Sequence, residues 1–356
     1  MEKALSLAAR GKGRTSPNPL VGAVIVKGNK IIASDYHRKA GTPHAEILAL
    51  KKAGKKAKGA TLYINLEPCC HTEKKTPPCT KSIIKSGIKK VVIAMIDPNP
   101  EVSGRGIKEL RKAGIETEVG IMEAKAKKLN EAFIKFITKK EPFVILKIAQ
   151  SIDGKIAASK GESKWITGEK AREYVHRLRN EVDAVLVGIG TVKKDNSSLT
   201  CRIRGGRNPH RIIADSNLQI PLNAKVLKHK DNKTIIATTK TANKKKINLL
   251  KSYGIKLLIL KSKAGKIDLK RLIKEMGKLN ITSVMIEGGS SINASALSSG
   301  IVDKVMFFTA PRIIGGVDAV PSVGGKSPAS LKDAIQLKNI RVTNIGEDIL
   351  VEGYLT

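Results

Sequence analysis

Four residues of the types used in zinc-dependent hydrolysis lie in two short segments of this 356-residue chain. His44 and Glu46 stand in TPHAE, where a helix is expected to begin, and Cys69 and Cys79 lie ten positions apart in LEPCCHTEKKTPPC. Three protein ligands leave the fourth position of a tetrahedral zinc open to water, whose pKa falls to about 7. In zinc deaminases, whose signature reads H-x-E followed by P-C, a glutamate that is not a ligand moves the proton. The pattern predicts a hydrolytic deaminase with His44, Cys69 and Cys79 as ligands and Glu46 as the catalytic residue.

Cys70 and His71 lie beside the predicted ligands and leave an alternative open. A closed, purely structural zinc site could use Cys69, Cys70, His71 and Cys79, but it would leave the upstream His-Ala-Glu unexplained. Cys69 is preferred because it directly follows Glu67-Pro68, where the first cysteine of the signature belongs. The usual signature has two residues between its cysteines, so the longer interval excludes a simple match to the short-spaced nucleobase deaminases. We expect His71 to contact substrate or to order the loop.

Weaker signals of an anion site occur in the second half of the chain. IEGGSSINAS follows an expected strand and enters a helix. Gly288-Gly289 would let a ligand approach the backbone, while Ser290, Ser291 and Asn293 offer donors at the helix N-terminus. From these residues alone, a plain structural turn is at least as good an interpretation. VGIGTVKKDN adds a second glycine-rich turn at Thr191, but its glycine spacing is not the dinucleotide fingerprint.

Charged residues near these turns also permit two interpretations. Arg179 and Arg202 could hold a phosphate through paired N–H donors, or they could form surface salt bridges. Lys147 and Asp153 flank the end of the first strand of the second half. They are candidates to polarise or protonate a substrate, or to form a structural ion pair.

Short apolar segments alternate with helical ones along the chain, which indicates an α/β protein. A charged stretch at 139–142 predicts a boundary between domains 1–141 and 142–356. The compact apolar strands of the second half are typical of a largely parallel sheet covered on both faces. A helix at 169–179 is expected to be capped by Thr167. We expect strands at 21–26, 31–33, 61–66, 91–96, 116–119, 143–148, 184–187, 211–214, 234–238, 256–260 and 283–286, and helices at 2–10, 44–52, 80–86, 107–113, 123–138, 169–179 and 269–278.

The net charge of +35 fits either a nucleic-acid groove or a generally lysine-rich surface. Lysine occurs in every segment, and aromatic residues make up only 3% of the chain, so the stacking side chains of single-strand binders are missing. We therefore expect no nucleic-acid partner, although the charge suits phosphorylated ligands. The chain shows neither an apolar run of about 18 residues nor a signal-peptide pattern, so no membrane partner and a cytoplasmic location are expected. Cys201 is expected to be a buried, small apolar residue.

The combination of motifs resembles the bifunctional deaminase/reductase family of riboflavin biosynthesis. TSPNPLVGAVIV, HAE, LEPCCH, TPPC and DPNPEVSGRG are similar to its deaminase domain. The resemblance implies that Asn18 and His71 face a pyrimidine. Relative to the family, the chain begins about one helical turn late, and the interval from Cys69 to Cys79 appears one residue longer, which would alter the loop at Glu73-Lys74.

LKIAQSIDGKIA, GESKWITG, VGIGTVKKDNSSLTCR, IEGGSSINAS and APRIIGG are similar, in the same order, to the family's reductase domain. The family's residue pattern implies one set that binds NADPH and one that binds substrate. Trp165, the only tryptophan, could instead pack in the core. The implied cofactor-binding residues are Gln150, Trp165, Thr191, Asp195, Ser216, Gly289, Ser290, Ser291, Ile292, Asn293, Ala294 and Ser295. The implied substrate-binding residues are Ser163, Arg179, Leu199, Arg202 and Glu287.

The resemblance also implies a fold and a reaction. The fold is an N-terminal cytidine-deaminase-like α/β/α sandwich followed by a C-terminal dihydrofolate-reductase-like α/β domain. The reaction is zinc-dependent hydrolytic deamination of 2,5-diamino-6-(5-phosphoribosylamino)pyrimidin-4-one, then NADPH-dependent reduction of its ribosyl group to ribityl. A homo-oligomer fits the family. Two alternatives remain: a deaminase for another pyrimidine or RNA with a degenerate second domain, and a nucleic-acid-binding protein with a relic zinc fold.

Overall fold

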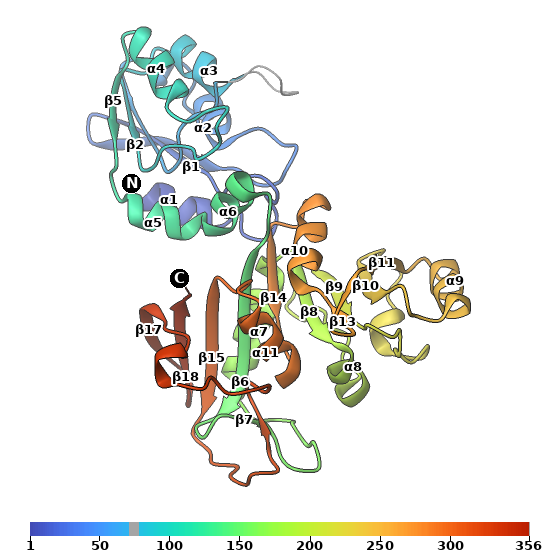
Figure 1. Ribbon diagram of the computed structural model, residues 1–356. Coiled ribbons are helices and arrows are strands. Elements are labelled where there is room, and N and C mark those ends of the chain that lie inside the picture. The colour runs from blue at the N-terminus through green and yellow to red at the C-terminus, as the bar shows by residue number, and fades with distance from the viewer. Residues whose placement is uncertain (71–77, 356) are drawn as a thin grey trace. The chain divides into compact units, whose positions relative to one another are not determined.

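The computed structural model describes residues 1–70 and 78–355. The chain forms two compact units, Met1–Lys140 and Glu141–Thr356, each built around its own sheet (Figure 1). Each unit is described separately below.

The first unit contains a five-stranded sheet in the order β2-β1-β3-β4-β5. β1 pairs antiparallel with β2 and β3, whereas β3, β4 and β5 are parallel to one another. The strands are β1 (Gly22–Lys27), β2 (Lys30–Tyr36), β3 (Thr61–Ile64), β4 (Lys90–Ile93) and β5 (Glu116–Val119). The helices are α1 (Glu2–Ala9), α2 (Ala45–Ala53), α3 (Cys79–Lys85), α4 (Arg105–Lys112), α5 (Glu123–Leu129) and α6 (Glu131–Lys139), with a 3₁₀ turn at Gly54–Ala57.

Alternating side chains of β1 explain why helices cover both faces of this sheet. Ala23 and Ile25 belong to a core that includes residues of α2 and α3, whereas Val24 packs with Ala4 and Leu7 of α1. Figure 1 shows α1 and α5 on one side of the strands and α2, α3 and α4 on the other. α1 thus buries an apolar face against the sheet.

The expected single helix at 123–138 is two helices, because Asn130 ends α5 and precedes α6. Asn130 is buried, and its side chain bonds both backbone groups of Leu20. The amide nitrogen of Leu20 donates to Asn130 Oδ1 at 2.8 Å, and Asn130 Nδ2 donates to the Leu20 carbonyl at 3.0 Å. A contact 110 positions away in sequence therefore breaks the helix, and helical spacing could not show it.

The second unit contains a nine-stranded sheet in the order β11-β10-β9-β8-β14-β6-β15-β18-β17. Neighbours from β11 to β15 are parallel, and β18 and β17 add an antiparallel edge. The strands are β6 (Phe143–Ser151), β8 (Ala184–Gly188), β9 (His210–Ala214), β10 (Thr234–Thr239), β11 (Lys256–Leu260), β14 (Ser283–Ile286), β15 (Lys304–Ala310), β17 (Lys338–Ile345) and β18 (Asp348–Tyr354). Four short strands, β7 (Lys155–Ala157), β16 (Val320–Pro321), β12 (Ser262–Lys263) and β13 (Lys266–Ile267), form two small ribbons.

Helices pack on both faces of this sheet, as the apolar strands require. On one face, buried residues such as Leu186 and Ile286 form a core with α10 (Leu269–Lys278) and α11 (Ser290–Ser298). On the other face, Val185 and Val187 pack with residues of α8 (Ile189–Asp195) and α9 (Lys244–Ser252). The longest helix of this unit among the described residues is α7 (Glu169–Glu181).

Three details of the second unit differ from the expectations. Gly168, not Thr167, caps α7, and its N–H donates to Asp348 Oδ2 at 2.8 Å. The antiparallel edge formed by β17 and β18 was not expected. Cys201 is only half-buried, and its thiol donates to the His176 carbonyl at 3.5 Å.

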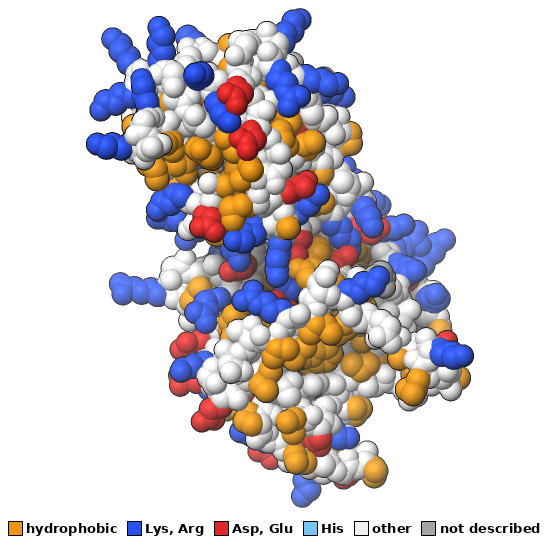
Figure 2. Space-filling view, turned by 90° about the vertical axis from the view of Figure 1, so that its left-hand side faces the viewer, with side chains coloured by type: hydrophobic (Ala, Val, Ile, Leu, Met, Phe, Trp, Pro, Cys, Tyr) orange, Lys and Arg blue, Asp and Glu red, His pale blue; other side chains and the backbone are white. Residues whose placement is uncertain are grey.

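No helix in the described part of the chain has both the length and the apolar character needed to span a membrane. Lysine and arginine side chains are spread over the visible face of each unit (Figure 2). This distribution fits a generally lysine-rich surface better than a single basic groove.

Candidate functional site: a zinc cluster and a separate cavity

The predicted zinc ligands come together in the first unit. His44 directly precedes α2, Cys69 follows β3, and Cys79 is the first residue of α3. His44 Nδ1 lies 3.2 Å from Cys79 Sγ and 3.7 Å from Cys69 Sγ. The three ligand atoms all lie within 4.8 Å of one another. Zn–N and Zn–S bonds of about 2.1 and 2.3 Å at tetrahedral angles put ligand atoms about 3.6–3.8 Å apart, so small shifts would fit them to a zinc ion. Among the described residues, this is the one histidine, cysteine and carboxylate cluster that could hold a metal ion.

The two cysteines of the cluster shift each other's pKa through a hydrogen bond between them. The hydrogen bond from Cys79, helped by His44, lowers the pKa of Cys69 to about 3. The same bond and burial raise the pKa of Cys79 well above its usual value. These contacts favour the thiolate of Cys69, the form in which cysteine binds zinc.

Glu46 lies in the first turn of α2, two residues after His44, and its side chain is buried. Burial raises the pKa of this carboxyl, an effect that the neighbouring His44 partly opposes. Its Oε2 atom has no hydrogen-bond partner in the described structure. An unpartnered carboxylate oxygen beside a metal site is suited to receive a proton from a bound water.

Cys70 lies outside the cluster, is half-buried, and has a pKa raised mainly by burial. The alternative closed site also needs His71, which, like Glu73 and Lys74, lies outside the described residues.

His37 contacts the cluster and was not expected from the sequence. Its ring packs edge-on against that of His44, with the centroids 5.4 Å apart, and its Nε2 lies 3.2 Å from Asn18 Nδ2. Burial lowers the pKa of His37, which favours the neutral ring. His37 thus connects the loop of Asn18 to a zinc ligand. A lone histidine after a strand gave no signal of this.

In the second unit, a cavity of about 1120 Å³ opens at the carboxyl ends of β8, β9 and β14. This edge of a parallel sheet is where α/β proteins bind ligands. All but two of the implied cofactor- and substrate-binding residues line the cavity. Gln150 and Ala294 do not, and Gln150 Nε2 instead donates to Thr309 Oγ1 at 3.4 Å.

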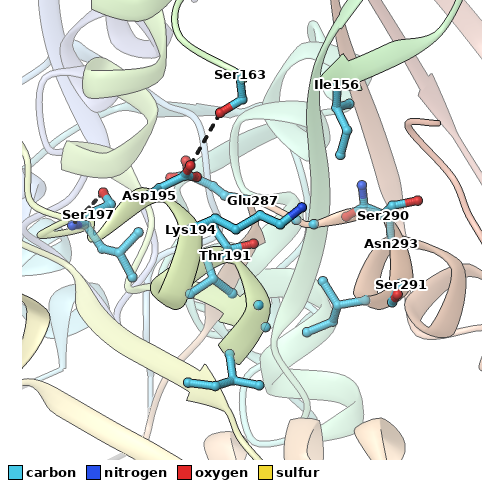
Figure 3. Close-up of a pocket in the computed structure, with 18 of the residues that line it drawn as sticks. Ile156, Ser163, Thr191, Lys194, Asp195, Ser197, Glu287, Ser290, Ser291 and Asn293 are labelled. Atoms are coloured by element: carbon cyan, nitrogen blue, oxygen red, sulfur yellow. Dashed lines mark hydrogen bonds between the residues drawn. The ribbon is translucent and has the colours of Figure 1, made fainter. Parts of the chain in front are cut away.

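Opposite walls of the cavity come from α8 and α11 (Figure 3). Thr191 and Lys194 project from α8, and the Lys194 side chain extends into the cavity. Ser290 and Asn293 stand on the α11 side. Ser163 Oγ donates to Asp195 Oδ1 at 3.3 Å and so ties a loop to the end of α8. The cavity thus combines hydroxyl donors and a cation at its walls, a set suited to an anionic ligand.

Glu287 and Arg179 form a buried ion pair at the floor of the cavity. Arg179 Nε and Nη2 donate to the two Glu287 oxygens at 2.7 and 2.8 Å, and Lys147 Nζ lies 3.5 Å from Oε2. Burial alone would raise the pKa of Glu287, but Arg179 and Lys147 outweigh it and lower the pKa to about 2. Arg179 therefore does not form a surface salt bridge, and its Nη1 is bonded to the carbonyl of Thr200 at 3.1 Å.

His176 is a second residue that the sequence did not indicate. Its Nε2 accepts a hydrogen bond from Arg202 Nε at 3.1 Å, and both residues line the cavity. Burial and the charges of Arg179 and Arg202 lower the pKa of His176 to about 4, so the ring is neutral at pH 7. The neutral ring holds Arg202, the implied substrate-binding cation, in place.

Asp153 and Trp165 complete the account of the predicted residues. Asp153 accepts from Ser151 Oγ and from the N–H groups of Ile314 and Gly315, and it is not a lining residue of the cavity. It therefore orders a loop. Trp165 is 57% exposed rather than packed in the core, with the Arg172 guanidinium 4.7 Å from its ring centroid.

Comparisons with known proteins agree with this division of the chain. Residues 1–95 match the cytidine and deoxycytidylate deaminase zinc-binding region, and residues 142–351 match the RibD C-terminal domain. The riboflavin biosynthesis protein RibD of Aquifex aeolicus is 47% identical over 353 residues, covering 99% of this chain and 96% of that protein. The corresponding protein of Escherichia coli is 36% identical and covers 98% of this chain and 96% of its own length.

Solved structures give the same result. Acinetobacter baumannii RibD is 37% identical with a TM-score of 0.90, and the match covers 100% of this chain and 97% of that one. A Thermotoga maritima diaminohydroxyphosphoribosylaminopyrimidine deaminase/5-amino-6-(5-phosphoribosylamino)uracil reductase is 39% identical with a TM-score of 0.86, with the same coverage. These matches confirm the expected fold class, a cytidine-deaminase-like domain followed by a reductase domain. The chain therefore belongs to the RibD family, the bifunctional deaminase/reductases of riboflavin biosynthesis.

Proposed function

We propose that the first unit, Met1–Lys140, deaminates 2,5-diamino-6-(5-phosphoribosylamino)pyrimidin-4-one by hydrolysis, with zinc held by His44, Cys69 and Cys79. The bound metal supplies a water of lowered pKa. That water would supply the oxygen that bonds to the amino-bearing ring carbon. Glu46 would take a proton from it through its unpartnered oxygen and deliver it to the amino group, whose bond to the ring carbon breaks to release ammonia. The buried Glu46 carboxyl beside the His-Cys-Cys cluster is the observation that carries this proposal.

We propose that the second unit, Glu141–Thr356, then reduces the ribosyl group to ribityl with NADPH. The cofactor supplies the hydride. The first two turns of α11, from Gly289 to Ser295, offer hydroxyl and N–H donors to its phosphates. Arg202, held by His176, contacts the phosphate of the substrate, and Lys147, which is paired with Glu287, is the candidate to polarise the substrate.

The residues proposed for the cavity follow the family pattern. Cofactor contacts are assigned to Gln150, Trp165, Thr191, Asp195, Ser216 and the stretch from Gly289 to Ser295, and substrate contacts to Ser163, Arg179, Leu199, Arg202 and Glu287. The position of Gln150 and Ala294 outside the cavity makes them the weakest members of this set. A cytoplasmic location, a homo-oligomer and the absence of a nucleic-acid partner also stay predictions.

Paired variants test the two activities separately. Glu46→Gln should abolish ammonia release, because a neutral amide cannot take the proton, and should leave NADPH oxidation with the deaminated substrate unchanged. Arg202→Ala should raise the KM for the deaminated substrate by about 10-fold or more, since a charged hydrogen bond contributes about 1.5–3 kcal/mol. It should leave ammonia release intact. Ammonia release by Glu46→Gln at the wild-type rate would refute its assigned role.

A further inference from the structure

The carboxylate of Glu67 connects the segment before Cys69 to the beginning of α4. Glu67 is buried, and its Oε2 accepts from the N–H groups of Asp97 at 3.1 Å and Gly104 at 2.9 Å. Its Oε1 accepts from Ile107 at 3.2 Å. An acidic side chain from elsewhere in the chain thus caps α4, at the helix end that favours negative charge.

The first turn of α4 also lies directly against the peptide that precedes Cys69. A Cβ atom placed on Gly106 would lie 2.3 Å from the Pro68 carbonyl oxygen, closer than side chains approach in proteins. Glycine at this position therefore lets the helix approach the ligand segment, and any side chain would push the two apart.

The same helix contacts the second cysteine segment through its next turn. Thr80 directly follows Cys79 and is completely buried. Its hydroxyl donates to Glu109 Oε2 on α4 at 2.9 Å, and its N–H donates to the Cys69 carbonyl at 3.3 Å. Helix α4 is thus bonded to both cysteine-bearing segments.

We propose that α4 sets the separation of the two cysteine sulfurs, with Glu67, Thr80 and Glu109 as positioning residues of the metal site. This inference rests on the zinc site of the proposed function. An interval of ten residues does not by itself fix the distance between two cysteines. A helix that is hydrogen-bonded to both cysteine segments does constrain that distance. The role also explains the motif DPNPEVSGRG, which supplies the N–H groups of Asp97 and Gly104 and the glycine at 106.

Thr80→Val tests this role because it removes the hydroxyl at nearly constant volume. Mutation of residues that orient metal ligands typically lowers metal affinity by about 10–100-fold. We expect zinc affinity, measured by competition with a chromophoric chelator, to fall by at least about 10-fold. In the Co²⁺-loaded full-length chain, the ligand-field bands should shift because the sulfur positions change. Thr80→Ser keeps the hydroxyl and should restore both readings.

Thr117→Val is the matched control. The Thr117 hydroxyl also contacts α4, where it accepts from Arg111 Nε at 2.6 Å, but it lies on β5 rather than on a cysteine segment. It should leave zinc affinity and the cobalt spectrum unchanged. If Thr80→Val does not fold, Glu109→Ala removes the acceptor from a partly exposed helical position and should reproduce the loss.

Unchanged zinc affinity and an unchanged cobalt spectrum in folded Thr80→Val or Glu109→Ala would overturn the role of α4. An equal loss in Thr117→Val would also overturn it, because the effect would then be general destabilisation of the unit. Failure of the wild-type chain to bind zinc or Co²⁺ would instead refute the metal site itself.

Discussion

Cys69 and Cys70 are adjacent in the chain but differ in environment. Cys69 lies in the cluster, where the bond from Cys79 favours its thiolate. Cys70 is half-buried, and its sulfur does not belong to the group of ligand atoms that lie within 4.8 Å of one another. Proximity in sequence therefore does not make the two cysteines equivalent as ligands.

We expect Cys70→Ser to keep one zinc per chain and Cys69→Ser to lose it, as measured by elemental analysis of the purified proteins. The deaminase activity should follow the zinc content. A full zinc complement in Cys69→Ser, with loss in Cys70→Ser, would mean that the ligand assignment is reversed.

The ion pair of Glu287 and Arg179 predicts a pH-dependent stability of the second unit. The folded-state pKa of Glu287 is about 2 against an ordinary value of 4.5, so the ionised form stabilises the fold by about 3 kcal/mol at neutral pH. This contribution is complete above pH 4.5 and is lost as the pH falls toward 2. Glu287→Gln leaves Arg179 buried without its counter-charge and should lower the free energy of unfolding at pH 7 by about 3–5 kcal/mol.

Denaturant unfolding followed from pH 7 to pH 3 checks this prediction. The difference between wild type and Glu287→Gln should shrink below pH 4.5, because protonation makes the native side chain neutral as well. A difference that stays constant with pH would show that the loss comes from packing rather than from charge.

At the scale of the elements, strands were predictable where their residues are buried on both faces. β10 is an uninterrupted buried run from Thr234 to Thr239, and its apolar and β-branched residues indicate a strand directly. β17 is different, because most of its residues are exposed, among them Ile340 and Val342. It is a strand because it pairs with β18, and that pairing is a long-range property of the sheet.

Long-range contacts also explain the helix ends that the sequence did not indicate. Asn130 breaks the 123–138 helix through its bonds to Leu20, and Asp348 supplies the acceptor at the N-terminus of α7. Local capping rules consider only neighbouring residues, so Thr167 was the reasonable but wrong choice.

The residues of the candidate site likewise fall into those that the sequence indicates and those that only the fold reveals. The zinc ligands and Glu46 could be identified because their chemistry needs particular residue types at short spacing. His37, His176 and Glu67 could not, since their contacts depend on how loops and elements come together. Glu67, for example, accepts from N–H groups 30 to 40 positions away. Positioning residues of this kind become visible only when the fold is known.

At the scale of the whole molecule, each of the two largest cores lies within one unit. Leu62 and Ile83 belong to a core of the first unit, whereas Leu146 and Ile286 belong to one of the second. The zinc cluster and the cavity are likewise each contained in one unit. A ligand therefore stabilises the unit whose residues bind it.

We expect two thermal transitions that respond to different ligands in the full-length chain. A zinc chelator should lower the transition of the first unit and leave the other in place. NADPH should raise only the transition of the second unit, because binding at 100 times Kd stabilises the native state by about 2.7 kcal/mol. For a unit of this size that corresponds to a shift of several degrees. Differential scanning calorimetry measures both transitions in one experiment.

Glu46→Gln and Arg202→Ala are the controls, because neither substitution removes a residue assigned to zinc or to the cofactor. Glu46→Gln keeps the three zinc ligands, so its first transition should still respond to the chelator, although its deaminase is inactive. Arg202 is assigned to substrate rather than cofactor, so Arg202→Ala should retain the full NADPH shift. The contrary outcome is that the chelator lowers both transitions equally, or that NADPH shifts the first transition. Either result would show that ligand binding to one unit changes the stability of the other, and would contradict their assignment as separately stabilised domains.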